Sequence, residues 1–96
     1  MERQLINKAD YSGESVELVR YKNGNFRADY HTGNIKMIND DIASVTFDES
    51  STVITVYRLG KPAENYWYAI CQDLQDYSRD GNDPLVAAVQ LAFNII

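Results

Sequence analysis

Residues 16–30 have the sequence VELVRYKNGNFRADY, and this stretch decides the fold class. Two runs of β-forming residues flank Asn23-Gly24, a pair typical of a tight hairpin because both central positions of a type I′ turn need positive φ. A two-residue turn there fixes the register. The pairs expected on the inner face are Tyr21 with Phe26, Val19 with Ala28 and Glu17 with Tyr30. The pairs expected on the other face are Arg20 with Arg27, Leu18 with Asp29 and Val16 with His31.

The segments after this hairpin extend it into a sheet. Turn residues predict turns at 31–34 and 39–41, with a short strand at 35–38 between them. Residues 42–47 alternate, which places Ala43, Val45 and Phe47 on the inner face. Residues 52–59 are apolar on both faces, as is typical of a strand at the centre of a sheet. The sequence therefore predicts an antiparallel meander of four or five strands, while residues 1–14 fit either a short helix or an edge strand.

The hydrophobic spacing changes after Pro62. Apolar residues at 63, 66, 67, 70, 71, 74 and 77 have helical spacing, and Pro62 and Glu64 fit the first turn of a helix. The alternative is a strand at 66–70, where Tyr-Trp-Tyr-Ala-Ile has strong β propensity. The helix is favoured because the apolar stripe continues to position 77. A second helix is expected to begin with Asp83 as N-cap and Pro84 as its first residue, and it is apolar nearly all round.

These elements predict an α+β fold, with an antiparallel four- to five-stranded meander sheet followed by two C-terminal helices packed on one face. The 96 residues form a single domain, with a β-sheet part at 15–59 and a helical part at 62–96. The only cysteine, Cys71, lies on the apolar stripe and is expected to be a small buried hydrophobe. The start of the chain lacks a signal-peptide pattern, and the longest apolar stretch has about twelve residues, whereas a membrane span needs about twenty. We therefore expect a cytoplasmic protein.

The negative charge is concentrated near the end of the chain. The net charge is −5, which disfavours duplex nucleic acid as a direct ligand. Residues 62–96 hold one basic and five acidic residues, so this third alone carries −4. Four of the acids recur every three or four positions, and we call them the acidic ridge: Asp73, Asp76, Asp80 and Asp83. The first two would share one face of the predicted helix. The ridge is either a solvated face or a surface that binds a basic partner.

Three other constellations are candidates for a site. Asp76, Ser78 and Asp80, followed by Gly81, match the start of a Ca²⁺-binding loop, but Ala87 occupies the position of the closing Glu, so we expect no metal and no cofactor. A capped turn between two helices explains the same residues. Arg20, Arg27 and His31 define a possible second surface, for an anion or an acidic partner. His31 and Cys71 are the only histidine and thiol, and no catalytic motif accompanies them, so we expect no enzyme.

In size, acidity and strand-then-helix layout the chain resembles small phage-encoded accessory proteins, including anti-CRISPR inhibitors. The segment from Asp83-Pro84 onward is similar to the Pro-then-Ala-rich final helix of several short phage proteins. The resemblance implies inhibition by binding, often by acidic mimicry of nucleic acid.

We therefore expect a non-enzymatic protein-binding or inhibitor protein of phage or mobile-element origin, whose acidic surface contacts a basic partner protein, with no direct nucleic-acid or membrane contact. One alternative is a homodimeric structural or accessory subunit that associates through the apolar end at 93–96. Another is a small-ligand module, whose seven tyrosines could stack a nucleotide or sugar, or a Ca²⁺-binding module.

Overall fold

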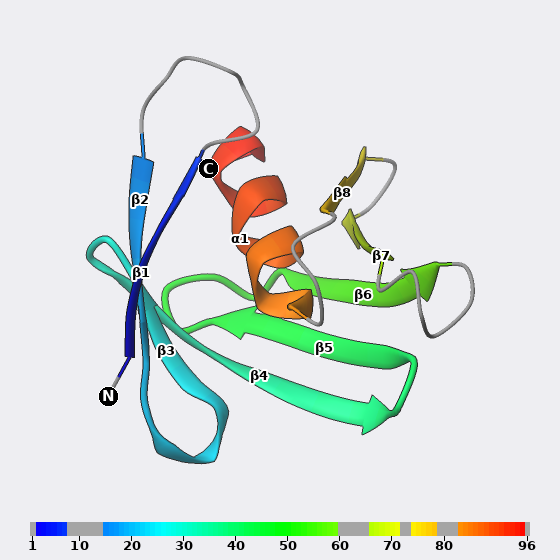
Figure 1. The fold of residues 1–96 in the computed structure, drawn as a ribbon, viewed down its shortest axis with the longest axis horizontal. Coiled ribbons are helices and arrows are strands. Elements are labelled where there is room, and N and C mark those ends of the chain that lie inside the picture. Colours follow the sequence, from blue (N-terminus) through cyan, green and yellow to red (C-terminus); the bar gives the residue numbers. More distant parts are fainter. Residues whose placement is uncertain (1, 8–14, 60–65, 72–73, 79–82, 96) are drawn as a thin grey trace.

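A computed structural model describes residues 2–7, 15–59, 66–71, 74–78 and 83–95 of the chain. The elements are β1 (Glu2–Asn7), β2 (Ser15–Arg20), the 3-10 turn η1 (Lys22–Gly24), β3 (Asn25–Ala28), β4 (His31–Asn39), β5 (Ile42–Phe47), β6 (Val53–Leu59), β7 (Tyr66–Cys71), β8 (Leu74–Ser78) and α1 (Pro84–Ile95). The eight strands form one antiparallel sheet in which each strand pairs with its neighbour in the sequence. The sheet is so strongly curled that β1 and β2 run across the direction of β5 and β6 (Figure 1).

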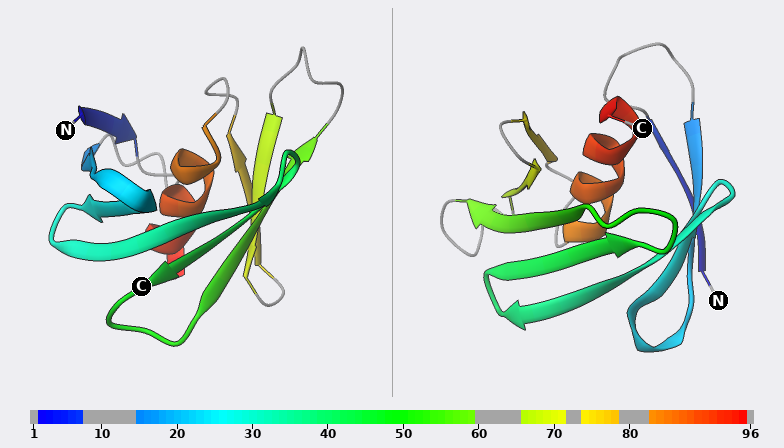
Figure 2. Two further views of the ribbon diagram at one scale, coloured as in Figure 1. Left: turned by 90° about the horizontal axis from the view of Figure 1, so that it is seen from below. Right: turned by 180° about the vertical axis from the view of Figure 1, so that it is seen from behind.

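The single α-helix of the described residues lies in the hollow of this curled sheet (Figure 2). It packs against β5, β6, β7 and β8, and we call the side of the sheet that faces it the concave face. The core fills this space, and its largest fully buried side chains include Trp67, Phe26 and Leu18 from the sheet and Leu85 and Leu91 from the helix. The other side of the sheet is the convex face.

The predicted arrangement of four or five strands followed by two helices is therefore wrong. The first expected helix is a pair of strands, β7 and β8, in which Cys71 pairs with Leu74. Along β7, buried residues alternate with half-buried ones, so Trp67, Ala69 and Cys71 face the core. Apolar residues on both faces of two short strands also fit helical spacing, and here the β propensity of Tyr66 to Ile70 decides the structure. The part at 62–96 thus contributes two strands as well as a helix.

The first hairpin forms, but its register is one residue away from the prediction. Three residues, Lys22–Gly24, make the turn instead of two, and Arg20 consequently pairs with Phe26. Asn23 and Gly24 do adopt positive φ, of 62° and 82°. A shift of one residue exchanges the faces of a strand. In β2 the residues that face the core are therefore Val16 and Leu18, whereas Phe26 and Ala28 of β3 point inward as expected.

The expected turn at 31–34 is also wrong, because these residues begin β4. The chain turns earlier, at Asp29-Tyr30, where Asp29 has φ of 54° and His31 pairs directly with Ala28. Gly33 belongs to the strand because the backbone passes very close to its neighbours there. A Cβ at this position would collide with the carbonyl oxygen of Thr46 and lie 2.8 Å from Cζ of Phe26. Gly33 is therefore needed because the neighbouring backbone and ring approach it closely within a strand. It does not serve a turn, as a glycine in this context suggests.

Several other expectations are confirmed. Residues 42–47 form β5 with Ala43, Val45 and Phe47 buried, and β6 is an interior strand. Residues 2–7 are the edge strand β1, which decides between the two alternatives for the start of the chain. Cys71 is buried.

The helix begins as the sequence indicates. The Asp83 carboxylate accepts a hydrogen bond of 3.3 Å from the backbone N–H of Val86, which makes Asp83 the N-cap, and Pro84 is the first helical residue. The helix can be apolar nearly all round because the sheet encloses it. Leu85, Val86, Val89 and Leu91 are all buried. Burial of each such side chain contributes roughly 1.5–3 kcal/mol, so the sheet and the helix stabilise one another.

Candidate functional site

A pocket opens on the concave face between the start of β4, the β5–β6 hairpin and the second half of α1. Its volume is about 460 Å³. The apolar wall consists of Phe47, Ile54 and Ala92, and the polar rim consists of His31, Glu49, Ser50 and Thr52. Small-molecule sites in proteins typically have volumes of roughly 300–1,000 Å³, mostly apolar walls and a few converging polar groups. The pocket has this composition.

His31 is the best-fixed polar group of the rim. As the first residue of β4 it pairs with the buried Ala28, so its side chain points to the concave face. Its ring lies between Tyr30, at a centroid distance of 4.6 Å, and Phe93 of the helix, at 5.6 Å. Its Nδ1 contacts Oε1 of Glu49. The His31 side chain is 13% exposed and that of Glu49 is 52% exposed, so the pair leads from the pocket wall to solvent.

Hydrogen bonds hold the β5–β6 turn, from which Glu49 projects, against β4. Asp48 donates its backbone N–H to the carbonyl oxygen of Thr32 (3.0 Å), and its carboxylate accepts from the Thr32 hydroxyl (2.7 Å). Inside the turn, Ser50 donates its N–H to the oxygen of Phe47 (3.2 Å), and its Oγ accepts from the N–H of Thr52 (3.0 Å). The rim is thus formed before any ligand arrives, which lowers the entropy that binding would cost.

The polar rim of the pocket is rich in hydrogen-bond acceptors and poor in positive charge. Among the described residues that line it, none is Lys or Arg, and the only ionisable groups are Glu49 and His31. The hydroxyls of Ser50 and Thr52 can both donate and accept. Such a site can hold an apolar body and orient one polar end.

The second surface proposed from the sequence is not a single surface. Arg20 faces the concave side, where it donates to Oε1 of Gln4 (3.0 Å) and forms an ion pair with Asp83 at the start of α1. His31 belongs to the pocket. Arg27 pairs with Val19 and lies on the convex face. The expected juxtaposition of Arg20 and Arg27 depended on the two-residue turn, and the register of the observed turn places them on opposite faces.

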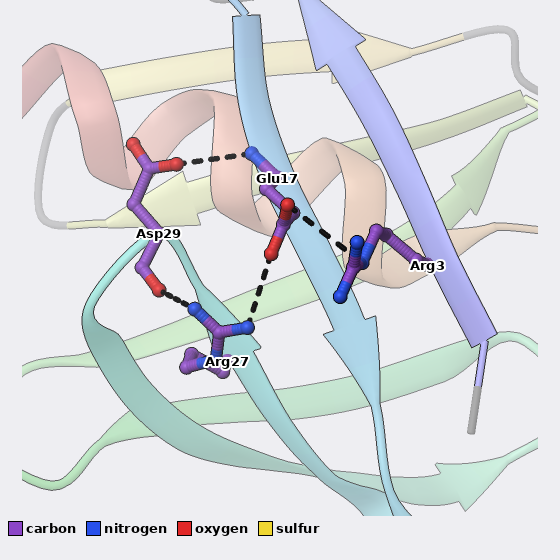
Figure 3. Close-up of polar contacts among 4 residues, drawn as sticks. All are labelled: Arg3, Glu17, Arg27 and Asp29. Carbon is purple, nitrogen blue, oxygen red and sulfur yellow. Dashed lines mark hydrogen bonds and ion pairs between the residues drawn. The ribbon is translucent and has the colours of Figure 1, made fainter.

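Arg27 instead belongs to a polar cluster on the convex face of β1, β2 and β3 (Figure 3). It donates to Oε1 of Glu17 (3.0 Å) and to the backbone oxygen of Asp29 (2.6 Å), while Oδ1 of Asp29 accepts from the N–H of Glu17 (3.0 Å). Arg3 approaches the other oxygen of Glu17 at 3.7 Å. Hydrogen bonds to Tyr21 and to Glu17 raise the pKa of Arg27. Both guanidinium groups therefore face a carboxylate, and the cluster ties three strands together without presenting a free cationic site.

The acidic ridge lacks the helix on which it was predicted. Asp76 lies in strand β8, so the proposed shared helical face with Asp73 does not exist. Asp73 and Asp80 lie outside the described residues. Asp83 caps α1 and pairs with Arg20, and its charge is therefore engaged within the protein.

The partial match to a Ca²⁺-binding loop also lacks its predicted setting. Asp76 and Ser78 belong to a strand and not to a loop that follows a helix. Asp80 is outside the description. Over the residues that the structure describes, no three His, Cys, Asp or Glu side chains gather as a metal site.

Most of the pocket could not be identified from the sequence. The sequence indicates His31 as a candidate, but for a different surface, and it gives Glu49 no role. Phe47, Ile54 and Ala92 were expected to be core residues, which they also are. No local pattern joins His31 to Glu49, eighteen residues away, or to a helix at the end of the chain.

In the part of the chain that the structure describes, no helix is both long enough and apolar enough to cross a bilayer. No protein-family model, curated protein or solved structure matches the chain, so the resemblance to phage accessory proteins stays a prediction.

Proposed function

We propose that this protein is a small, non-enzymatic binding protein whose ligand occupies the pocket between the β5–β6 hairpin and α1. The observation that carries the proposal is the cavity of about 460 Å³ with an apolar wall and the His31–Glu49 pair at its rim. This is the small-ligand alternative among the functions that the sequence allows. It is preferred because the pocket residues lie together in the structure. The acidic ridge, in contrast, was predicted on a helix, and Asp76 lies in a strand.

The wall and the rim support binding in different ways. Phe47, Ile54 and Ala92 are buried and belong to the core, so the pocket wall is as rigid as the core itself. The rim is held by hydrogen bonds between β4 and the β5–β6 turn. A ligand would therefore displace water from a shaped surface without ordering the chain, and this is the condition for useful affinity in a small pocket.

A thermal-shift screen against a metabolite collection tests the proposal when it is paired with a variant in which the pocket is filled. Ala92→Leu adds three carbons to a side chain of the pocket wall. We expect some compounds to raise the melting temperature of the wild type and to lose that effect in Ala92→Leu. Thr52→Phe fills the pocket from its rim and serves if Ala92→Leu does not fold. Compounds that stabilise the wild type and both variants equally would bind elsewhere, and an empty screen would contradict the proposal.

A second proposal retains the inhibitor function expected from the sequence, in which an acidic surface contacts a basic partner protein. The charge of −4 over residues 62–96 supports it, as does the position of Asp76 on β8 at the edge of the sheet, because edge strands can add a strand from a partner.

Under either proposal we place the protein in the cytoplasm, because its single cysteine cannot form an intramolecular disulfide.

The test of this second proposal should omit Asp83, whose substitution would damage the helix cap. We expect the triple variant Asp73→Asn, Asp76→Asn, Asp80→Asn to recover less partner in a pull-down than the wild type, and high salt to have the same effect. The matched control is the triple variant Asp10→Asn, Glu14→Gln, Asp40→Asn, which removes the same amount of charge from other parts of the chain. Equal, salt-insensitive recovery by the wild type and both variants would reject the acidic surface.

A further inference from the structure

We infer that the pocket selects ligands with a cationic amine at one end of an apolar body, and that the Glu49 carboxylate receives the amine. This inference rests on the proposed function, and it adds the chemical class of the ligand. It is drawn from the charge of the rim, the unused acceptor atoms and the apolar wall.

The charge of the rim favours a cation. Glu49 is the only carboxylate among the described lining residues, and the same lining holds no lysine or arginine. Asp48 is the neighbour of Glu49 in the sequence, but its carboxylate accepts a hydrogen bond from Thr32 on the convex face and does not line the pocket. A carboxylate or phosphate ligand would meet the charge of Glu49 without a lysine or arginine of the described pocket lining to balance its own.

The unused hydrogen-bonding atoms point the same way. The contact with His31 uses Oε1 of Glu49, and no described residue donates a hydrogen bond to Oε2. The hydroxyl oxygen of Thr52 is a further acceptor at the rim. An ammonium group has three donors and no acceptor, so it can satisfy several of these atoms at once.

The fixed position of the Glu49 carboxylate beside an apolar wall supports the interaction. The His31 side chain is mostly buried between Tyr30 and Phe93, and it fixes one oxygen of Glu49. The carboxylate is therefore held at the boundary between the apolar wall and water. An ion pair at such a boundary is less screened than one on an open surface. The apolar wall, made of Phe47, Ile54 and Ala92, accepts the carbon chain of the ligand.

Three six-carbon probes that differ only in their end group test the inference: hexylamine, hexanol and hexanoate. Their affinities are measured at pH 7 by titration of the ¹⁵N-labelled protein, with the backbone amides of Thr52 and Ala92 as reporters of the pocket. We expect hexylamine to bind more tightly than hexanol, and hexanoate more weakly than both. We expect Glu49→Gln, which keeps the shape of the side chain, to weaken hexylamine about tenfold and to leave hexanol unchanged. Asp40→Asn, which removes an exposed charge from the β4–β5 turn, is the matched control and should change none of the three.

The outcomes separate this inference from the proposed function. If hexanol and hexanoate perturb Thr52 and Ala92 while hexylamine binds no better than hexanol, the pocket binds ligands but the amine preference is wrong. If Asp40→Asn weakens hexylamine as much as Glu49→Gln does, the preference reflects overall charge and the assignment to Glu49 is wrong. If none of the probes perturbs the pocket amides at millimolar concentration, the inference fails, and an empty metabolite screen in addition would remove the proposed function as well.

Discussion

Replacement of Asp83 by alanine should destabilise the protein by about 2–3 kcal/mol, because this one carboxylate has two structural tasks. It caps α1 through the N–H of Val86, and loss of an N-cap costs about 1 kcal/mol. It also pairs with Arg20, where the two side chains are 28% and 19% exposed. A partly buried, charge-assisted contact of this kind contributes roughly 1–2 kcal/mol, between the values for exposed pairs and for hydrogen bonds to buried charges.

Two further variants separate these contributions. Asp83→Ser keeps a good N-cap residue and removes only the ion pair, so it should cost about 1–2 kcal/mol, and Arg20→Met should cost a similar amount. The double variant Arg20→Met, Asp83→Ser should be hardly less stable than either single variant, because both remove the same contact. Urea unfolding followed by the fluorescence of Trp67, the only tryptophan, measures all four. Stability of Asp83→Ala within about 0.5 kcal/mol of the wild type would refute the reasoning, and additive losses in the double variant would refute the ion pair.

Three further predictions concern the sheet. Gly33→Ala should lower the free energy of unfolding by about 2–3 kcal/mol, measured by thermal unfolding, because the added Cβ would collide with the backbone of Thr46. A loss no larger than that of the exposed Lys36→Ala would contradict the close packing. Val19 is 1% exposed on the convex face and Leu5 is 70% exposed, so Val19→Ala should cost about 1–3 kcal/mol and Leu5→Ala less than about 0.5 kcal/mol; equal losses would contradict the burial of Val19. Cys71 should react with an aromatic disulfide reagent only as fast as the protein opens, and prompt reaction in the native state would contradict its burial.

The parts of the fold that the sequence predicted are those decided by local chemistry. The alternation in residues 42–47 and the Asp83-Pro84 helix start depend on neighbouring residues only, and both are confirmed. The hairpin at Asn23-Gly24 is also local, but the length of its turn depends on packing of the strands, and a difference of one residue exchanged the faces of β2. Residues 66–78 fit helical spacing and strand alternation alike, so the sequence pattern had no means to exclude either. The β propensity of Tyr66 to Ile70 and the pairing of β7 with β6 together favour the strand.

The candidate site was less predictable than the fold, because it is assembled from segments distant in the sequence. His31 and Glu49 meet only because the turn at Asp29-Tyr30 places His31 on the concave face and hydrogen bonds hold the β5–β6 turn against β4. Ala92 reaches the pocket from the helix, which the sequence could predict as buried but could not position. The charge pattern, in contrast, can be read directly from the sequence. It predicted an acidic ridge along a helix, but Asp76 lies in a strand.

The order of the elements along the chain has a consequence for how the protein is made. Each strand pairs with its neighbour in sequence, so on the ribosome the hairpins can close one after another as they emerge. The helix that fills their hollow follows all eight strands. Until it docks, Trp67, Phe26 and Leu18 line an open apolar surface. The nascent chain is therefore most exposed to aggregation and to chaperones in the interval just before α1 leaves the ribosome exit tunnel.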